Sequence, residues 1–251
     1  MSFELVCEIE PPTRADLRPV RHQIGVLSSV ASAFLIPDNH LGRATVSSIA
    51  VAHEVEAMGG RSIACLNSRD RNLLGLRRDL LTAAAYGVDQ FFLVHGDDPD
   101  VGSRTSQLRV REMIDEVHAF SGAKPFRAGA VSGLKALPDW KRNADFLFLQ
   151  VSFALDDLLR WRESISVDIP VYAGVMVIAS EAMAKRLAAG PGAFDLPADL
   201  VAAVARDRSA GVAAACELTL AIRDSGAFAG VHLVPVSRYR EVAARLEPEL
   251  A

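Results

Sequence analysis

The sequence has few cysteines, and their spacing argues against a metal or disulfide framework. Only Cys7, Cys65 and Cys216 occur in 251 residues, with no CxxC pair and no Cys/His cluster. We therefore expect a reducing compartment and no structural zinc. Met1-Ser2 leads directly into FELVCEIE without a basic segment, and no apolar run reaches the roughly 18 residues of a membrane span. These absences predict a soluble, cytoplasmic protein.

Signals for nucleic-acid and nucleotide-fold proteins are also missing. The net charge is −4, and Lys and Arg are scattered among Asp and Glu without a basic stripe, so nucleic acid is not an expected partner. Glu10-Pro11-Pro12 follows the first apolar run where a Rossmann unit needs GxGxxG, and the sequence has no P-loop. Dinucleotide-binding and P-loop folds are therefore disfavoured.

What the sequence does contain is a regular alternation of apolar runs and helical patterns. Strand-length runs lie at 3–9, 32–36, 61–66, 91–96, 126–131, 145–151, 170–177 and 230–236. Because these runs are continuously apolar, they favour strands buried on both faces. Helical patterns lie between them at 44–60, 69–87, 103–122, 154–164, 181–189, 197–208, 209–226 and 237–246.

Eight strands alternating with helices over about 250 residues predict a (β/α)8 TIM barrel. No change of composition marks a linker, so we expect one domain over residues 1–251. A doubly wound open sheet is the alternative. The segment after the fifth strand, residues 132–144, is too short for a full helix.

Polar side chains gather at the predicted carboxyl ends of the strands, where TIM-barrel chemistry takes place. In FFLVHGDDPD, residues 91–100, a buried strand opens directly into His95, Asp97 and two further aspartates. Asp98 and Asp100 fit ordinary turn chemistry, whereas Asp97 stands at the strand end. Too few other ligands stand at strand ends to accompany His95, so we expect no metal site.

Several motifs together resemble the methylenetetrahydrofolate reductase family. They are CEIEPP (7–12), LIPDNHLGRATV (35–46), SRDRN (68–72) and VHGDDP (94–99). The resemblance covers residues 3–100 well, thins through 101–170 and returns in outline over 171–240. It implies a TIM barrel that reduces 5,10-methylenetetrahydrofolate to 5-methyltetrahydrofolate with a nicotinamide donor, normally through bound FAD.

The resemblance also implies roles for individual residues. Glu8 falls on the family's general acid, which protonates the imidazolidine ring so that it opens to an iminium ion. Asp97 falls on the aspartate that stabilises this cation. Gln150 matches the pterin-binding glutamine. The remaining matches place Arg238 at the glutamate tail, Asp38 and Asn39 at the substrate, and Cys65, His95, Gly96 and Val131 in the cofactor pocket.

The departures from the family pattern concentrate on the flavin. Pro37 stands at the flavin-contacting threonine, Cys65 at a histidine, His95 at an arginine and Val131 at a tyrosine. The helix between strands five and six is reduced to ALPDWKRN, residues 136–143. We therefore expect NADH or NADPH to transfer hydride directly to folate in a ternary complex, with FAD doubtful.

Two other interpretations stay open. A non-catalytic folate-binding or regulatory member would also lose its flavin contacts, although it would not need Glu8. An unrelated TIM-barrel lyase or metal-dependent hydrolase is disfavoured because no lysine stands at a strand end and the first strand has no His-x-His. The sequence leaves the oligomeric state undecided.

Overall fold

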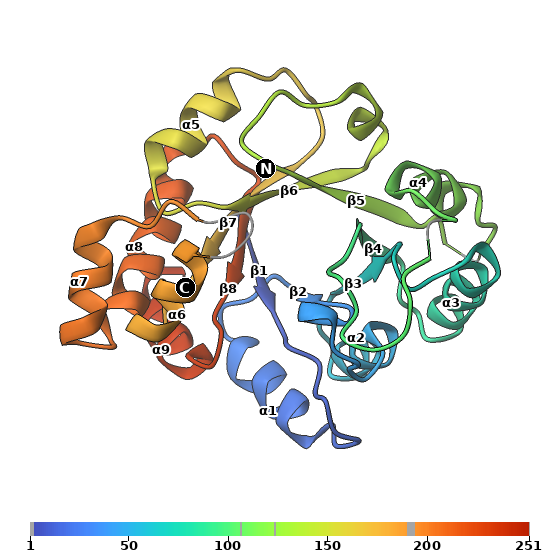
Figure 1. Ribbon diagram of the computed structural model, residues 1–251, viewed down its shortest axis with the longest axis horizontal. Coiled ribbons are helices and arrows are strands. Elements are labelled where there is room, and N and C mark those ends of the chain that lie inside the picture. The colour runs from blue at the N-terminus through green and yellow to red at the C-terminus, as the bar shows by residue number, and fades with distance from the viewer. Residues whose placement is uncertain (1–2, 106, 123, 190–193, 251) are drawn as a thin grey trace.

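Eight short parallel strands close into a barrel at the centre of the molecule (Figure 1). The computed structural model describes residues 3–105, 107–122, 124–189 and 194–250. The strands are β1 (Glu4–Glu8), β2 (Ala33–Ile36), β3 (Ser62–Asn67), β4 (Gln90–Val94), β5 (Arg127–Ser132), β6 (Phe146–Val151), β7 (Val171–Met176) and β8 (Gly230–Val234). Each strand pairs with the next, and β8 pairs with β1 through Val6 and His232, which closes the sheet. The predicted (β/α)8 TIM barrel is confirmed.

Helices surround the strands on the outside (Figure 1). They are α1 (Arg18–Leu27), α2 (Ser48–Ala57), α3 (Leu73–Ala85), α4 (Val110–Ala119), α5 (Leu155–Glu163), α6 (Glu181–Ala189), α7 (Ala198–Arg206), α8 (Ala210–Ser225) and α9 (Tyr239–Leu250). Two short 3-10 helices, η1 (His40–Gly42) and η2 (Asp139–Asn143), lie in loops. In the sector between β5 and β6, η2 stands in place of a full helix, as the short segment predicts.

The helix boundaries differ from the sequence-based expectation in two places. Helix α1 was not expected, although Val20, Ile24 and Leu27 form a buried stripe at helical spacing and a proline stands in the first turn. Helix α4 begins at Val110 rather than at 103, because Glu112 accepts a hydrogen bond from the backbone N–H of Arg109 and so caps the helix there.

The strands separate two apolar cores because successive side chains point to opposite faces. On β1, Leu5 and Cys7 face the helices, whereas Val6 faces the barrel interior. The interior is filled largely by aromatic rings, with Phe148 lying 5.0 Å from both Phe92 and Tyr172 between ring centroids. Burying each such ring contributes roughly 1.5–3 kcal/mol. Glu4 and Glu8 share the face of Val6 and therefore belong to the interior.

A polar cluster around Glu4 lies at the amino-terminal end of the barrel. The Glu4 carboxylate accepts hydrogen bonds from Tyr172 Oη at 2.5 Å and from Arg61 Nη2 at 2.8 Å. Burial alone would raise the pKa of Glu4, but these two donors lower it below its ordinary value. Burial and the Glu4 contact raise the pKa of Tyr172. Both groups are therefore held in the protonation states that this contact requires, Glu4 ionised and Tyr172 neutral.

Candidate active site

The opposite, carboxyl-terminal end of the barrel holds most of the side chains that the sequence singles out. On β1, Glu8 is the last residue and lies one inward position beyond Val6. On β6, Gln150 follows Phe146 and Phe148 on the same inward face and is exposed. The barrel interior below these two residues is apolar. An inward carboxyl group and an inward amide therefore line the mouth, from strands that are separated by β7 and β8.

Among the described residues, Glu8 makes one close ionic contact, with His232 on β8. The distance from His232 Nε2 to Glu8 Oε2 is 3.2 Å, and the side chains are only 10% and 16% exposed, respectively. The imidazole stacks on Phe148 with a centroid distance of 5.2 Å and an interplanar angle of 19°. Nothing in the sequence indicates that the pairing of β8 with β1 brings His232 beside Glu8.

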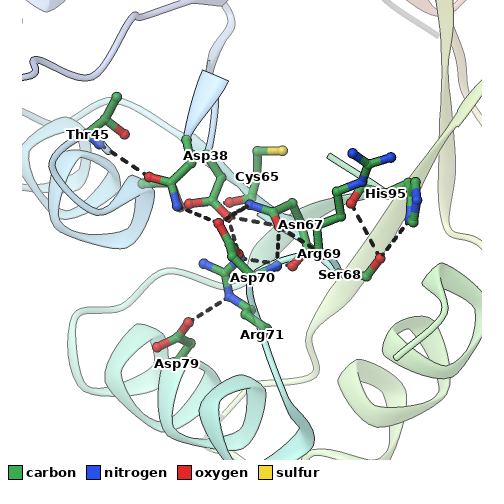
Figure 2. Close-up of polar contacts among 12 residues, drawn as sticks. Asp38, Thr45, Cys65, Asn67, Ser68, Arg69, Asp70, Arg71, Asp79 and His95 are labelled. Carbon is green, nitrogen blue, oxygen red and sulfur yellow. Dashed lines mark hydrogen bonds and ion pairs between the residues drawn. The ribbon is translucent and has the colours of Figure 1, made fainter. Parts of the chain in front are cut away.

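A polar network built around Asn67 joins the ends of β2 and β3 (Figure 2). The Asn67 side-chain amide donates to Asp38 Oδ2 at 2.8 Å and to Asp70 Oδ2 at 3.0 Å. Its carbonyl oxygen accepts from the backbone N–H groups of Arg69, at 3.0 Å, and of Asp70, at 3.2 Å. The buried Asn67 side chain thus makes hydrogen bonds to the loops after β2 and β3. The SRDRN motif, residues 68–72, contributes largely to this network.

Arg71 supplies the positive charge of the network. It forms a salt bridge with Asp38 and donates through Nε to Asp79 Oδ2 at 2.9 Å. Burial would lower the pKa of Arg71, but the two carboxylates outweigh it and raise the pKa. The Arg71 and Asp38 side chains are only 12% and 4% exposed. This is a buried ion pair.

Asp38 and Asn39, predicted to bind substrate, are both engaged in this network. Asp38 accepts from Asn67 and Arg71, and its carboxylate is almost inaccessible. Asn39 donates to Asp70 Oδ2 at 2.6 Å and accepts from the backbone N–H of Thr45 at 3.2 Å. These contacts order the loop after β2. A direct contact of either side chain with substrate stays a prediction.

Asp97 links the loops after β4 and β2. Its Oδ2 accepts the backbone N–H of Leu41 at 2.8 Å, and the residue is exposed. Leu41 has φ +58° and Asn39 φ +46°, a left-handed conformation that costs energy for residues with side chains. A Cβ on Gly42 would lie 2.0 Å from the carbonyl oxygen of Asp98. Close packing of the two loops therefore fixes the Asp97 carboxylate at the mouth.

The four residues predicted for the cofactor pocket occupy different environments. His95 is exposed at the mouth, and its Nδ1 lies 3.2 Å from Ser68 Oγ (Figure 2). Gly96 has φ +90°, and a Cβ there would lie 2.8 Å from Asn67 Cβ, so packing already accounts for the glycine. Cys65 and Val131 belong to the apolar interior. Their roles in cofactor binding stay predictions.

The Cys65 thiol stays protonated. Burial raises its pKa, and the carboxylates of Asp38 and Glu8 raise it further. A thiol buried among apolar side chains, with carboxylates nearby, is a poor nucleophile and a poor metal ligand. No group of three or more His, Cys, Asp or Glu side chains within the described residues has a metal-binding arrangement.

The residues present do not fit a flavin. Pro37 is buried and has no N–H, Cys65 is only 6% exposed, and Val131 has no polar side-chain atom. In the β5–β6 sector, η2 is short, with five residues, Asp139–Asn143. The side chains of Pro37, Cys65 and Val131 offer no strong hydrogen-bond donor to a pyrophosphate or ribityl chain.

Arg238 lies on the outer side of the barrel mouth. It lines a cavity of about 400 Å³ between α8 and α9, together with Arg208 and Arg245. Its Nη1 donates to Glu241 Oε1 at 2.9 Å. The guanidinium therefore lies at a groove between α8 and α9, and its contact with a substrate carboxylate stays a prediction.

Comparisons with known proteins extend the description of the fold. No protein-family model matches the sequence, and no curated protein matches it. Among the helices of the described residues, none has the length and apolar character needed to cross a bilayer.

Solved structures with similar folds have low sequence identity. An uncharacterized protein from Clostridium thermocellum that binds two copies of 5-methyl-5,6,7,8-tetrahydrofolic acid has a TM-score of 0.66 and 11% identity, covering 99% of this chain and 96% of its own. A mutant tryptophan synthase alpha-subunit from Pyrococcus furiosus has a TM-score of 0.56 and 12% identity, covering 98% and 96%. A Rhizomucor miehei beta-1,3-glucanosyltransferase has a TM-score of 0.56 and 12% identity, covering 91% and 86%. At such identities the likeness establishes the TIM-barrel fold.

Proposed function

We propose that this protein reduces 5,10-methylenetetrahydrofolate to 5-methyltetrahydrofolate with NADH or NADPH, by direct hydride transfer. The observation that carries the proposal is the position of Glu8. Its carboxyl group faces inward at the mouth of the barrel, it is largely shielded from water, and it has no Lys or Arg partner among the described residues. A carboxyl group in such a place is available for proton transfer.

The reaction requires a proton and a hydride. Glu8 donates a proton to N10 of the imidazolidine ring, the bond from N10 to the methylene carbon breaks, and a cationic iminium forms at N5. Hydride from C4 of the nicotinamide then adds to the methylene carbon, which gives the N5-methyl group and the oxidised dinucleotide. Solvent returns the proton to Glu8, so one proton and one hydride are consumed per turnover.

Other residues at the mouth assist in distinct ways. The Asp97 carboxylate, fixed by the Leu41 N–H, places a negative charge where it stabilises the iminium cation. Gln150 both donates and accepts, which suits the amide edge of a pterin. Arg238 offers a cation for the glutamate tail. Because no flavin carries the hydride, both substrates bind together, and we expect steady-state patterns that intersect.

Support for a folate ligand comes from two directions. The motifs around Glu8, Asp97 and Gln150 resemble a family that acts on folate. The similarly folded Clostridium thermocellum protein binds 5-methyl-5,6,7,8-tetrahydrofolic acid, which is the product of the proposed reaction. That binding also favours a second candidate, a folate-binding protein without catalysis.

The test is NADH oxidation by the purified protein, with and without methylenetetrahydrofolate and without added flavin, while the visible spectrum is recorded. Folate-dependent oxidation by a colourless protein would support direct transfer. Oxidation only after addition of FAD would mean that hydride passes through a flavin. If neither condition gives oxidation but 5-methyltetrahydrofolate binds in calorimetry, the folate-binding candidate is correct.

A further inference from the structure

The His232 imidazole is buried without a regular hydrogen-bond partner for one of its nitrogens. Nε2 is shielded from solvent, and within the described residues no acceptor or donor meets it with good hydrogen-bond geometry. The nearest oxygen of an acidic side chain is Glu8 Oε2, at 3.2 Å. A buried polar atom without a partner costs free energy. A small rotation of the Glu8 carboxyl group would align this contact and satisfy Nε2.

The ring has little freedom to turn elsewhere. It stacks on Phe148 at 5.2 Å with planes inclined by 19°, and its strand is held in register on both sides, with His232 opposite Val6 on β1 and Gly174 on β7. Phe148 belongs to the apolar interior. The Nε2 edge therefore faces Glu8 because the fold holds the ring there.

We infer that His232 is a positioning residue for Glu8. The inference rests on the proposed function. The imidazole donates its Nε2–H to Glu8 Oε2, so that Oε1 is the oxygen that carries the proton toward the substrate. When Glu8 gives up that proton, the contact becomes a charge-assisted hydrogen bond, which is stronger than the neutral one. His232 thus stabilises the state that forms as the acid reacts, without touching the substrate.

Two substitutions separate this role from simple packing. His232→Phe keeps an aromatic ring against Phe148 but removes the donor, and we expect kcat to fall about 10- to 100-fold with KM for folate changed less than about threefold. His232→Gln places an amide N–H near the position of Nε2, and we expect it to recover most of the lost turnover. In a Glu8→Gln background, His232→Phe should cause no further loss, because the group it positions is gone.

A measurement independent of activity tests the contact itself. In protein labelled with ¹⁵N in its histidine rings, the His232 signals are assigned by their absence from the His232→Gln spectrum. We expect the neutral tautomer with a proton on Nε2, and a changed Nε2 shift in Glu8→Gln but not in Glu4→Gln. An Nε2 chemical shift that is the same in the wild type and in Glu8→Gln would overturn the inference. Equal turnover in wild type and His232→Phe would also overturn it. If the wild-type protein does not reduce folate, the proposed function fails, and the spectra alone still decide whether His232 holds Glu8.

Discussion

Glu4 and Glu8 stand at the two ends of the same strand, on the same inward face, and their surroundings are opposite. The Glu4 carboxylate is saturated by Tyr172 and Arg61 at the amino-terminal end of the barrel. Glu8 lies two inward positions further along β1, and among the described residues its one close ionic contact is with His232, at 3.2 Å. Both are carboxyl groups at the boundary of one apolar interior.

The difference shows how one strand supplies both a structural and a reactive carboxylate. Donors fix Glu4 as an anion, and they lower its pKa despite its burial. A carboxyl group held in this way stays ionised near neutral pH. Glu8 has no cationic partner in the described chain, so substrate can become its main partner. Glu4, whose carboxylate is saturated with hydrogen bonds, has a structural role at one end of the barrel. Glu8, which lacks such donors, is available for the reaction at the other end.

The largest effect should come from exchanging the two glutamates for glutamine in separate variants. Glu8→Gln removes the proton donor, and we expect turnover of methylenetetrahydrofolate to fall about 10²- to 10⁴-fold. Folate affinity should change little, because the amide keeps the size and polarity of the side chain. Glu4→Gln should retain turnover per folded molecule. Steady-state kinetics and calorimetry on both variants check this, and equal losses of turnover in the two would abolish the proposed distinction.

The next largest effect concerns stability and the buried pair behind the site. Arg71→Met leaves Asp38 buried without its cation, and we expect a loss of about 3–5 kcal/mol in the free energy of unfolding. Arg78→Met is the matched control, because Arg78 also pairs with Asp79, at 3.0 Å, but is 75% exposed. This exposed pair should contribute less than about 1 kcal/mol. Denaturant titrations that place both variants at the same midpoint would contradict the assignment of Arg71 as a buried structural cation.

A smaller effect tests the saturation of Glu4 through its pH dependence. Because the folded-state pKa of Glu4 lies below its ordinary value of 4.5, ionised Glu4 stabilises the fold above that pH. This stabilisation is lost as the pH falls through the folded-state pKa. We expect Glu4→Gln to lower the free energy of unfolding by about 1–3 kcal/mol at pH 7. This gap in the free energy of unfolding between wild type and variant should shrink toward pH 3.

Unfolding curves at pH 7 and pH 3 measure that gap, with Glu10→Gln as the control at an exposed position. A gap that is the same at both values would mean that the charge of Glu4 contributes nothing to stability.

The smallest effect belongs to Gln150, at the same level of the mouth as Glu8. Its side chain is exposed, so Gln150→Ala should leave the unfolding midpoint unchanged. Losing one hydrogen bond to the pterin should raise KM for folate about 3- to 10-fold, with kcat within about twofold of wild type. An unchanged KM with a reduced kcat would show that Gln150 does not orient the pterin.

The fold was predictable because barrel strands buried on both faces read as short apolar runs, and the eight runs match the eight strands. Helix α1 was also predictable, because Val20, Ile24 and Leu27 are apolar at helical spacing, and leaving it out of the sequence-based prediction was wrong. The strand-end positions of Glu8, Asp97 and Gln150 followed from the same pattern.

Contacts between distant residues could not be predicted in this way. The approach of His232 to Glu8 exists only because β8 pairs with β1, and the Asn67 network depends on how the loops after β2 and β3 pack. Likewise, the periodicity of apolar residues does not predict that the Asp38 side chain faces Arg71 rather than the mouth of the barrel. These features depend on closure of the barrel and on side-chain geometry, which spacing along the chain does not encode.

Transfer of deuterium from NADH labelled at C4 tests the central claim most directly. Each of the two stereoisomers is incubated with methylenetetrahydrofolate in ordinary water, and the product is examined by mass spectrometry. Direct transfer predicts one deuterium in the product methyl group from one isomer and none from the other. Consumption of NADH with no deuterium in the product from either isomer would mean that the hydrogen passes through an exchangeable carrier such as a reduced flavin, and would contradict the account.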